Sequence, residues 1–157
     1  MDQKDDHPFK DAHEWDNWNP AAVRDVMGTH GLGKFLQFQY ESHGTDWVEL
    51  SLDWREALVG VAETGVIASG VVISLMDIAA SQSVWTRLNK FHPHATMDLR
   101  VDYLRPSPPG KRLFGRAECY RITRSVAFVR GIAHNGHAED PVAHIAATFI
   151  NTSGYLK

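Results

Sequence analysis

The most constraining feature of the sequence is a nearly all-apolar segment between Ser69 and Arg87. Its apolar positions are Val71, Val72, Ile73, Leu75, Met76, Ile78, Ala79, Ala80, Val84 and Trp85. A segment of this length and composition predicts a helix that is buried on most of its sides. A sheet with one solvated face covers only part of such a helix, so a second sheet must cover the rest, which favours a homodimer or a dimer of dimers.

Alternating apolar and polar residues predict strands on both sides of this helix. Before it, Asn19 is expected to cap a short helix over 20–27, and strands over 34–41 and 47–54 are expected to form a hairpin. Residues 55–68 are expected to be an irregular connection. Four more strands are expected after the helix, at 95–104, 112–122, 125–134 and 142–150. This order predicts an α+β domain in which one antiparallel sheet wraps a central helix.

Composition argues against several classes of protein. The 157 residues carry 16 Lys and Arg against 19 Asp and Glu, and this net charge of −3 argues against a protein held to nucleic acid by phosphate attraction. Cys119 is the single cysteine, which excludes an intramolecular disulfide and a four-thiolate zinc site. No apolar run is long enough to span a membrane, and the first twenty residues hold no signal-peptide core, so we expect a cytoplasmic protein with no membrane partner.

Motifs for metal, nucleotide and serine-hydrolase chemistry are absent from the sequence. Five of the nine histidines are loosely clustered, namely His92, His94, His134, His137 and His144. They lack ligand spacing, so we expect them on surface loops and expect no metal or cofactor. The glycine-rich stretch 28–33 precedes an expected strand instead of opening a helix, so it does not predict a phosphate loop, and no Gly-x-Ser-x-Gly motif occurs.

The chain is expected to hold an acidic N-terminal leader over 1–19 and a single domain over 20–157. Trp15 and Trp18 lie in the leader, where two indoles would either dock onto a surface or stay in a mobile tail.

One stripe of the apolar helix is polar. At about 100° per residue, Gly70, Ser74, Asp77 and Ser81 share one face. A buried unpaired carboxylate is costly, so Asp77 either accepts hydrogen bonds from Ser74, Ser81 or a neighbouring strand, or it acts as a base or nucleophile.

The expected start of the same helix offers a second chemical group. Free backbone amides at Ser69 and Gly70 would either form a plain cap or hold a developing oxyanion. Gly70 and Asp77 are seven residues apart, which is about 10 Å along a helix axis, too far for both to reach one carbonyl carbon. A site that uses both groups therefore requires two subunits that face each other across a two-fold axis.

Two segments resemble a known family. They are Thr64-Gly65-Val66-Ile67-Ala68-Ser69-Gly70-Val71-Val72-Ile73-Ser74-Leu75-Met76-Asp77-Ile78-Ala79 and Thr96-Met97-Asp98-Leu99-Arg100-Val101-Asp102-Tyr103-Leu104-Arg105-Pro106. With these, residues 33–150 resemble a hotdog-fold thioesterase of the PaaI-like acyl-CoA type. The family's His-Gly-Gly reads Ala68-Ser69-Gly70 here, and an upstream Asn of the family has Ala62 or Glu63 near its place.

The resemblance implies a role for each matching residue. Asp77 would be the general base or nucleophile, and Ser69 or Gly70 would donate the oxyanion-binding N–H. Thr96 would help to place the attacking water, and Ser81 stands where another branch of the family carries a Thr.

Basic residues are concentrated between positions 100 and 130, which hold eight of the 16 Lys and Arg residues. They either guard sheet edges or include a subset that binds the phosphates of coenzyme A, for which the resemblance favours Arg124 and Arg105. The functional hypotheses are hydrolysis of an acyl-CoA thioester, non-catalytic binding of acyl-CoA, and hydration or dehydration of a thioester.

Overall fold

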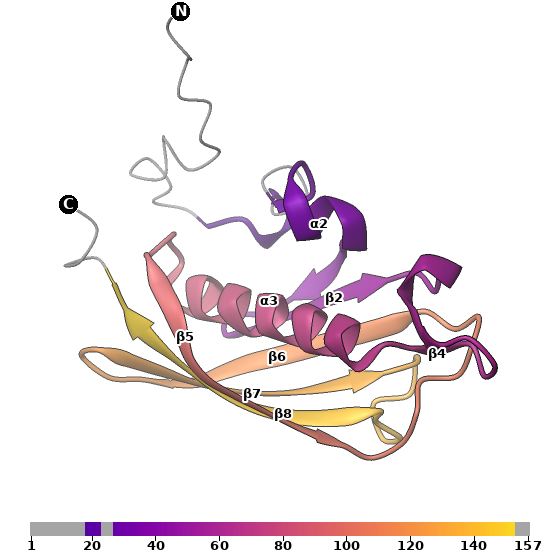
Figure 1. The fold of residues 1–157 in the computed structure, drawn as a ribbon. Coiled ribbons are helices and arrows are strands. Elements are labelled where there is room, and N and C mark those ends of the chain that lie inside the picture. The colour runs from indigo at the N-terminus through magenta and orange to yellow at the C-terminus, as the bar shows by residue number, and fades with distance from the viewer. Residues whose placement is uncertain (1–17, 23–26, 153–157) are drawn as a thin grey trace, which may run out of the picture.

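The computed structural model describes residues 18–22 and 27–152, which form a curved antiparallel sheet with one long helix on its concave face (Figure 1). The elements in chain order are η2 (Pro20–Ala22), α2 (Gly31–Leu36), β1 (Gln39–His43), β2 (Trp47–Leu52), η3 (Glu56–Leu58), β3 (Val59–Val61), β4 (Val66–Ile67), α3 (Ser69–Leu88), β5 (His94–Tyr103), β6 (Leu113–Ile122), β7 (Val126–His134) and β8 (Ala143–Asn151). The predicted α+β class is confirmed.

The main sheet has six strands in the order β1-β2-β6-β7-β8-β5, and all its pairings are antiparallel. Strand β5 follows α3 in the chain but pairs with β8, so it forms one edge of the sheet. This placement brings β5 beside α3, where strand and helix exchange side-chain contacts.

Helix α3 packs closely on the concave face because two strand glycines make room for it. A Cβ on Gly115 would lie 2.9 Å from Cγ of Leu75, and a Cβ on Gly131 would lie 3.0 Å from Cε of Met76. Leu75 and Met76 are fully buried in the resulting core. A larger residue at either glycine would push the helix away from the sheet.

The expectations for the long helix and the last four strands are confirmed to within one residue at each end. The hairpin that pairs β1 with β2 is also confirmed. Helix α3 begins after Ala68 and ends at Leu88, and the next residue, Asn89, has a φ of +50°, the left-handed conformation that commonly terminates helices.

The strand expected over 34–41 is wrong in its first half. Residues Gly31–Leu36 form the helix α2 instead, so the glycine-rich stretch 28–33 does open a helix, although one of only six residues. Gln37 adopts a left-handed conformation with φ of +56°, which ends α2 at once and lets β1 start at Gln39. The sequence alternation of Leu36 and Phe38 matches a strand pattern, but it spans this break.

Two further segments extend or change the expectations. The connection expected to be irregular over 55–68 contains η3 and a small hairpin of β3 and β4. Asn19 caps the start of the first helical segment as expected, since its Oδ1 accepts a hydrogen bond from the Ala21 amide at 3.0 Å. Residues 23–26 of the helix expected over 20–27 and most of the expected leader, including Trp15, lie outside the described residues.

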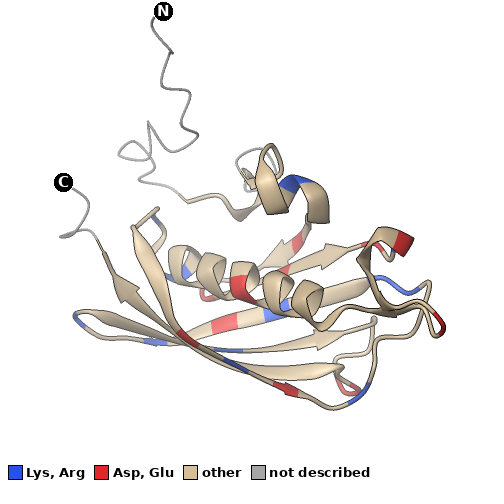
Figure 2. Ribbon diagram, viewed as in Figure 1, with Lys and Arg blue, Asp and Glu red and all other residues tan. Residues whose placement is uncertain are grey.

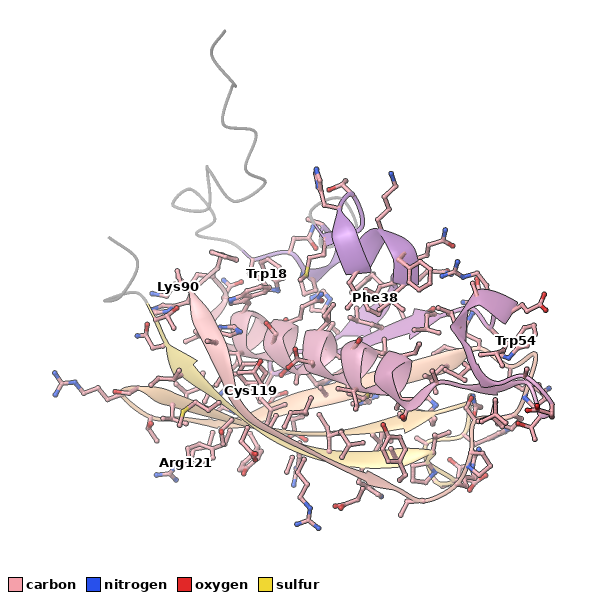
Figure 3. All side chains as sticks on the ribbon, in the orientation of Figure 1. Trp18, Phe38, Trp54, Lys90, Cys119 and Arg121 are labelled. Atoms are coloured by element: carbon pink, nitrogen blue, oxygen red, sulfur yellow. The ribbon has the colours of Figure 1, made fainter. Side chains whose placement is uncertain are left out.

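Trp18 lies over the end of α3 (Figure 3). It is buried against Trp85, with ring centroids 4.8 Å apart, and its amide donates to the carbonyl of Asn89. The described start of the chain is therefore fixed to the C-terminal end of α3.

One side of α3 stays open to solvent in the single chain. Ile73 is 40% exposed there, Gly70 is exposed, and Asp77 is half-buried. The neighbouring edge strand β5 exposes Met97 and Tyr103. The prediction that a second sheet covers this side stays a prediction.

Candidate active site

Asp77 is the only acidic residue of α3 and lies in the middle of the helix (Figure 2). Its Oδ1 accepts a hydrogen bond of 2.9 Å from Oγ1 of Thr96 on β5. Among the residues that the structure describes, Oδ2 has no hydrogen-bond partner. Thr96 thus orients the carboxylate and leaves one oxygen free on the open side of α3, so the partner of Asp77 is the neighbouring strand and not Ser74.

Ser74 instead donates to its own helix. Its Oγ lies 2.8 Å from the carbonyl oxygen of Gly70. The polar stripe predicted on α3 is therefore present, but its members do not form one network.

The start of α3 offers unpaired backbone donors. The cap residue Ala68 has no side-chain acceptor, and in the described part of the chain the amides of Ser69 and Gly70 have no acceptor either. A Cβ on Gly70 would meet nothing within 4 Å, so this end of the helix is open. The macrodipole and free N–H groups make it suited to hold an oxyanion.

Tyr103 fixes this helix start from β5. Its hydroxyl donates to the carbonyl oxygen of Ser69 at 3.0 Å, and burial raises the pKa of the Tyr103 phenol. The phenol therefore stays protonated, as this hydrogen bond requires.

Ser81 lies one helical turn beyond Asp77 and contacts a second residue of β5. Its Oγ is 2.8 Å from Nε2 of His94. Burial lowers the pKa of His94 to about 4, so the imidazole is neutral near pH 7. His94 was expected on a surface loop, and that expectation is wrong, since it begins β5 and packs against Trp85 and Phe149.

His134 is a second buried histidine that was expected on a surface loop. It lies at the end of β7, where Gly136 N–H donates to its Nδ1 and Nε2 lies 3.2 Å from Oε2 of Glu49. The hydrogen bond with His134 lowers the pKa of Glu49. Buried polar groups of this kind need partners, and Glu49 provides one.

The buried imidazole of His94 predicts a measurable pH dependence of stability. Its pKa of about 4 in the folded chain lies below the ordinary histidine value of 6.5, so the unfolded chain binds more protons between those pH values. The contribution of the neutral His94 to the free energy of unfolding is therefore fully present above about pH 6.5. It falls by about 3 kcal/mol as the pH drops to 4. We expect His94→Phe to remove this part of the slope in urea unfolding measured from pH 7 to pH 4.5.

The charged or titratable groups around the His94 imidazole are few. His92 faces it, while Lys90 and Arg124 line the same cavity, and the contacting residues of α3 and β8 are uncharged. The matched control is His137→Phe on the exposed loop after β7, which should keep the wild-type slope. A slope that His94→Phe leaves unchanged would show that this histidine is not the source.

The structure commits Arg105 to internal contacts. Its guanidinium donates from Nε to Oδ1 of Asp140 at 3.1 Å, from a second nitrogen to the Asp140 carbonyl, and from a third to Oδ1 of Asn135. These contacts tie the loop between β7 and β8 to the end of β5. They leave phosphate binding by Arg105 without support.

Arg124 lies at the turn between β6 and β7 and lines a cavity of about 190 Å³. The cavity lies under the C-terminal part of α3, with Val84, Leu88 and Phe149 among its apolar walls. Arg105 lines a different cavity, next to Ser69 at the other end of α3. The two arginines are therefore not brought together.

Two features of the site were not predicted as functional. One is the Ser81–His94 contact, and the other is an irregularity in β5, where Met97 lies between Thr96 and Asp98 as the register with β8 shifts. Bulges of this kind redirect neighbouring side chains and are common beside active sites. The spacing of His94 and Thr96, two residues apart, is the signal that could have indicated a shared strand face.

These observations define an α+β protein with an acid on a central helix, an open helix start and a long edge strand. The model of the thioesterase superfamily matches residues 64–141. The chain belongs to the thioesterase superfamily, and by that membership it is classed with the thioester hydrolases. The predicted hotdog fold is confirmed, and PaaI is among the solved proteins that share it.

Two relatives and two solved structures illustrate the similarity. The chain is 27% identical over 117 residues to the medium/long-chain acyl-CoA thioesterase YigI of Escherichia coli, which covers 66% of this chain and 75% of that protein. It is 26% identical over 90 residues to a Saccharolobus solfataricus protein named as an esterase, covering 57% of this chain and 58% of that protein's length. A crystal structure from Pseudomonas aeruginosa is 35% identical with a TM-score of 0.69, covering 75% and 87% of the two chains. The phenylacetic acid degradation protein PaaI of Thermus thermophilus, in a mutant form, is 21% identical with a TM-score of 0.65, covering 75% and 96%.

In the part of the chain that the structure describes, every helix is too short or too polar to span a membrane.

Proposed function

We propose that this chain hydrolyses acyl-coenzyme A thioesters at a site built from two subunits. The observation that carries the proposal is the Asp77 carboxylate, which Thr96 orients while one oxygen stays free. Membership of the thioesterase superfamily and the activity named for YigI support the choice of a thioester as substrate.

In the proposed reaction Asp77 acts as general base. It takes a proton from a water molecule whose oxygen attacks the thioester carbonyl carbon, and the carbonyl oxygen becomes an oxyanion. The C–S bond then breaks, the thiolate of coenzyme A takes up a proton, and a carboxylic acid is released. As a nucleophile, Asp77 would instead attack the carbonyl carbon and expel the coenzyme A thiolate, and water would then hydrolyse the resulting anhydride to the carboxylic acid and free Asp77.

The oxyanion would be held by the amides of Ser69 and Gly70 of the partner subunit. Within one chain, α3 separates Gly70 from Asp77 by about 10 Å, which is too far for a single carbonyl group. A two-fold axis along the open side of α3 would place each Asp77 opposite the other subunit's helix start. It would also cover the exposed Ile73 and shield the carboxylate and its attacking water from bulk solvent.

The direct test is release of free thiol from a panel of acyl-CoAs of different chain length. We expect turnover with at least one member of the panel. No thiol release from any acyl-CoA would contradict the proposed function.

Arg124 is proposed to bind a phosphate group of coenzyme A. It is exposed beside Lys90 on the wall of the 190 Å³ cavity, and a guanidinium can hold a phosphate through two hydrogen bonds. We expect Arg124→Ala to raise KM about tenfold and leave kcat near wild type, because the contact is the same in ground and transition states. Steady-state kinetics measures both constants.

The matched control is Arg121→Ala near the end of β6 (labelled in Figure 3), because Arg121 is also exposed but does not line the cavity beside Arg124. Equal KM values for the two variants would contradict the role of Arg124.

A second candidate function is non-catalytic binding of acyl-CoA. It is favoured by Ala68, which precedes α3 where the family carries a histidine and which has no polar side chain. Such a protein would show an acyl-CoA-dependent rise in melting temperature without release of thiol.

A further inference from the structure

Two hydrogen bonds connect β5 to α3 side by side. Thr96 contacts Asp77 at 2.9 Å, and His94 contacts Ser81 at 2.8 Å. The two strand residues are two positions apart and so share a face, while the two helix residues are four apart and lie one turn from each other. The Ser81–His94 contact therefore continues the line of side chains that holds Asp77.

The His94 ring is held firmly in place. Its centroid lies 5.0 Å from that of Trp85 in a tilted arrangement and 5.0 Å from that of Phe149 in an edge-to-face arrangement. A ring fixed between two aromatic side chains on α3 and β8 can hold a hydroxyl in one orientation, which a solvated histidine cannot do.

We propose that His94 is a positioning residue of the hydrolytic site, which fixes the Ser81 hydroxyl so that Ser81 and Asp77 together hold the attacking water. This inference rests on the proposed function. The Cβ atoms of helix residues four apart are about 5–6 Å from each other, which leaves room for one water between a carboxylate and a hydroxyl. Ser81 has one donor and two acceptor positions, so one contact with His94 leaves capacity for the water.

His94 contributes no proton to the reaction in this arrangement. Burial lowers its pKa to about 4, so it stays neutral while Asp77 takes the proton of the water. Its role is to fix the geometry, in the way that outer residues fix the direct ligands of a reacting group.

The test compares His94→Phe, Ser81→Ala, their double variant and His94→Gln by steady-state thiol release. We expect each single variant to lower kcat at least tenfold with little change in KM, because the water is not part of the substrate-binding contacts. The double variant should lose no more than the worse single variant, since both remove one interaction. His94→Gln should recover most of kcat, because its side-chain amide can reach the Ser81 hydroxyl.

Controls separate this role from folding and from the proposed function. His94→Phe keeps an aromatic ring between Trp85 and Phe149, and melting temperatures near neutral pH check that each variant folds. His137→Phe, an exposed loop histidine, should behave as wild type. If the wild type is active but the losses of kcat add up in the double variant, the role of His94 is overturned and the proposed function stands. The same holds if His94→Phe loses no activity. A wild type that releases no thiol from any acyl-CoA overturns the proposed function and this role with it.

Discussion

Replacing Asp77 with Asn is expected to lower kcat for thioester hydrolysis by 10²–10⁴-fold. Asn keeps the size of the side chain and can still accept the hydrogen bond from Thr96, but it cannot take a proton from water or attack a carbonyl. The fold should be unchanged, because the carboxylate lies on the solvent-exposed side of α3 and not in the core. Thiol release measured at saturating acyl-CoA gives the comparison.

The control for this variant is Asp98→Asn. Asp98 lies on β5, two residues from Thr96, and its side chain is exposed. It should retain wild-type kcat. If Asp77→Asn hydrolyses each acyl-CoA within threefold of wild type, Asp77 is neither the base nor the nucleophile.

Replacing Gly70 with Pro is expected to lower kcat by about 10²–10³-fold, the usual cost of losing one oxyanion donor. Proline removes the amide hydrogen and is tolerated in the first turn of a helix, where that amide makes no intrahelical hydrogen bond. Gly70→Ala is the matched variant, because it keeps the amide and its Cβ meets nothing within 4 Å. The alanine variant should be at least tenfold more active than the proline variant.

The neighbouring amide is tested by Ser69→Pro, and melting temperatures show whether either proline disturbs α3. A folded Gly70→Pro chain and a folded Ser69→Pro chain that both match wild-type kcat would exclude the helix start as the oxyanion site.

Much of the architecture could be predicted from the sequence because its signals are local and strong. Helix α3 is a nearly all-apolar segment that is too long for a strand. In β6, β7 and β8, buried and more exposed residues alternate between turns. The N-terminal part was harder, because the left-handed Gln37 lies between α2 and β1 and interrupts what reads as one alternating segment. The left-handed conformation of a single residue does not change the hydrophobic pattern of the sequence, so the pattern cannot reveal it.

Only part of the candidate site could be predicted from the sequence. The stripe that includes Asp77 follows from helical spacing, and the family resemblance singled out Thr96, but its hydrogen bond to Asp77 was not predicted. The contact between Ser81 and His94 depends on how β5 lies along α3, which local sequence does not specify. Arg105 shows that charge alone does not identify a contact partner, since its guanidinium holds Asp140 in the fold and its predicted phosphate contact stays a prediction.

The central claim, that each site combines Asp77 of one subunit with the helix start of the other, is tested most directly by a mixed dimer. Asp77→Asn and Gly70→Pro chains, each inactive alone, are co-expressed with different affinity tags and purified through both tags. In the mixed dimer one site receives both altered residues and the other receives neither, so activity should return to about half that of wild type. A mixed dimer that forms but stays as inactive as its two parents would contradict a site shared between subunits.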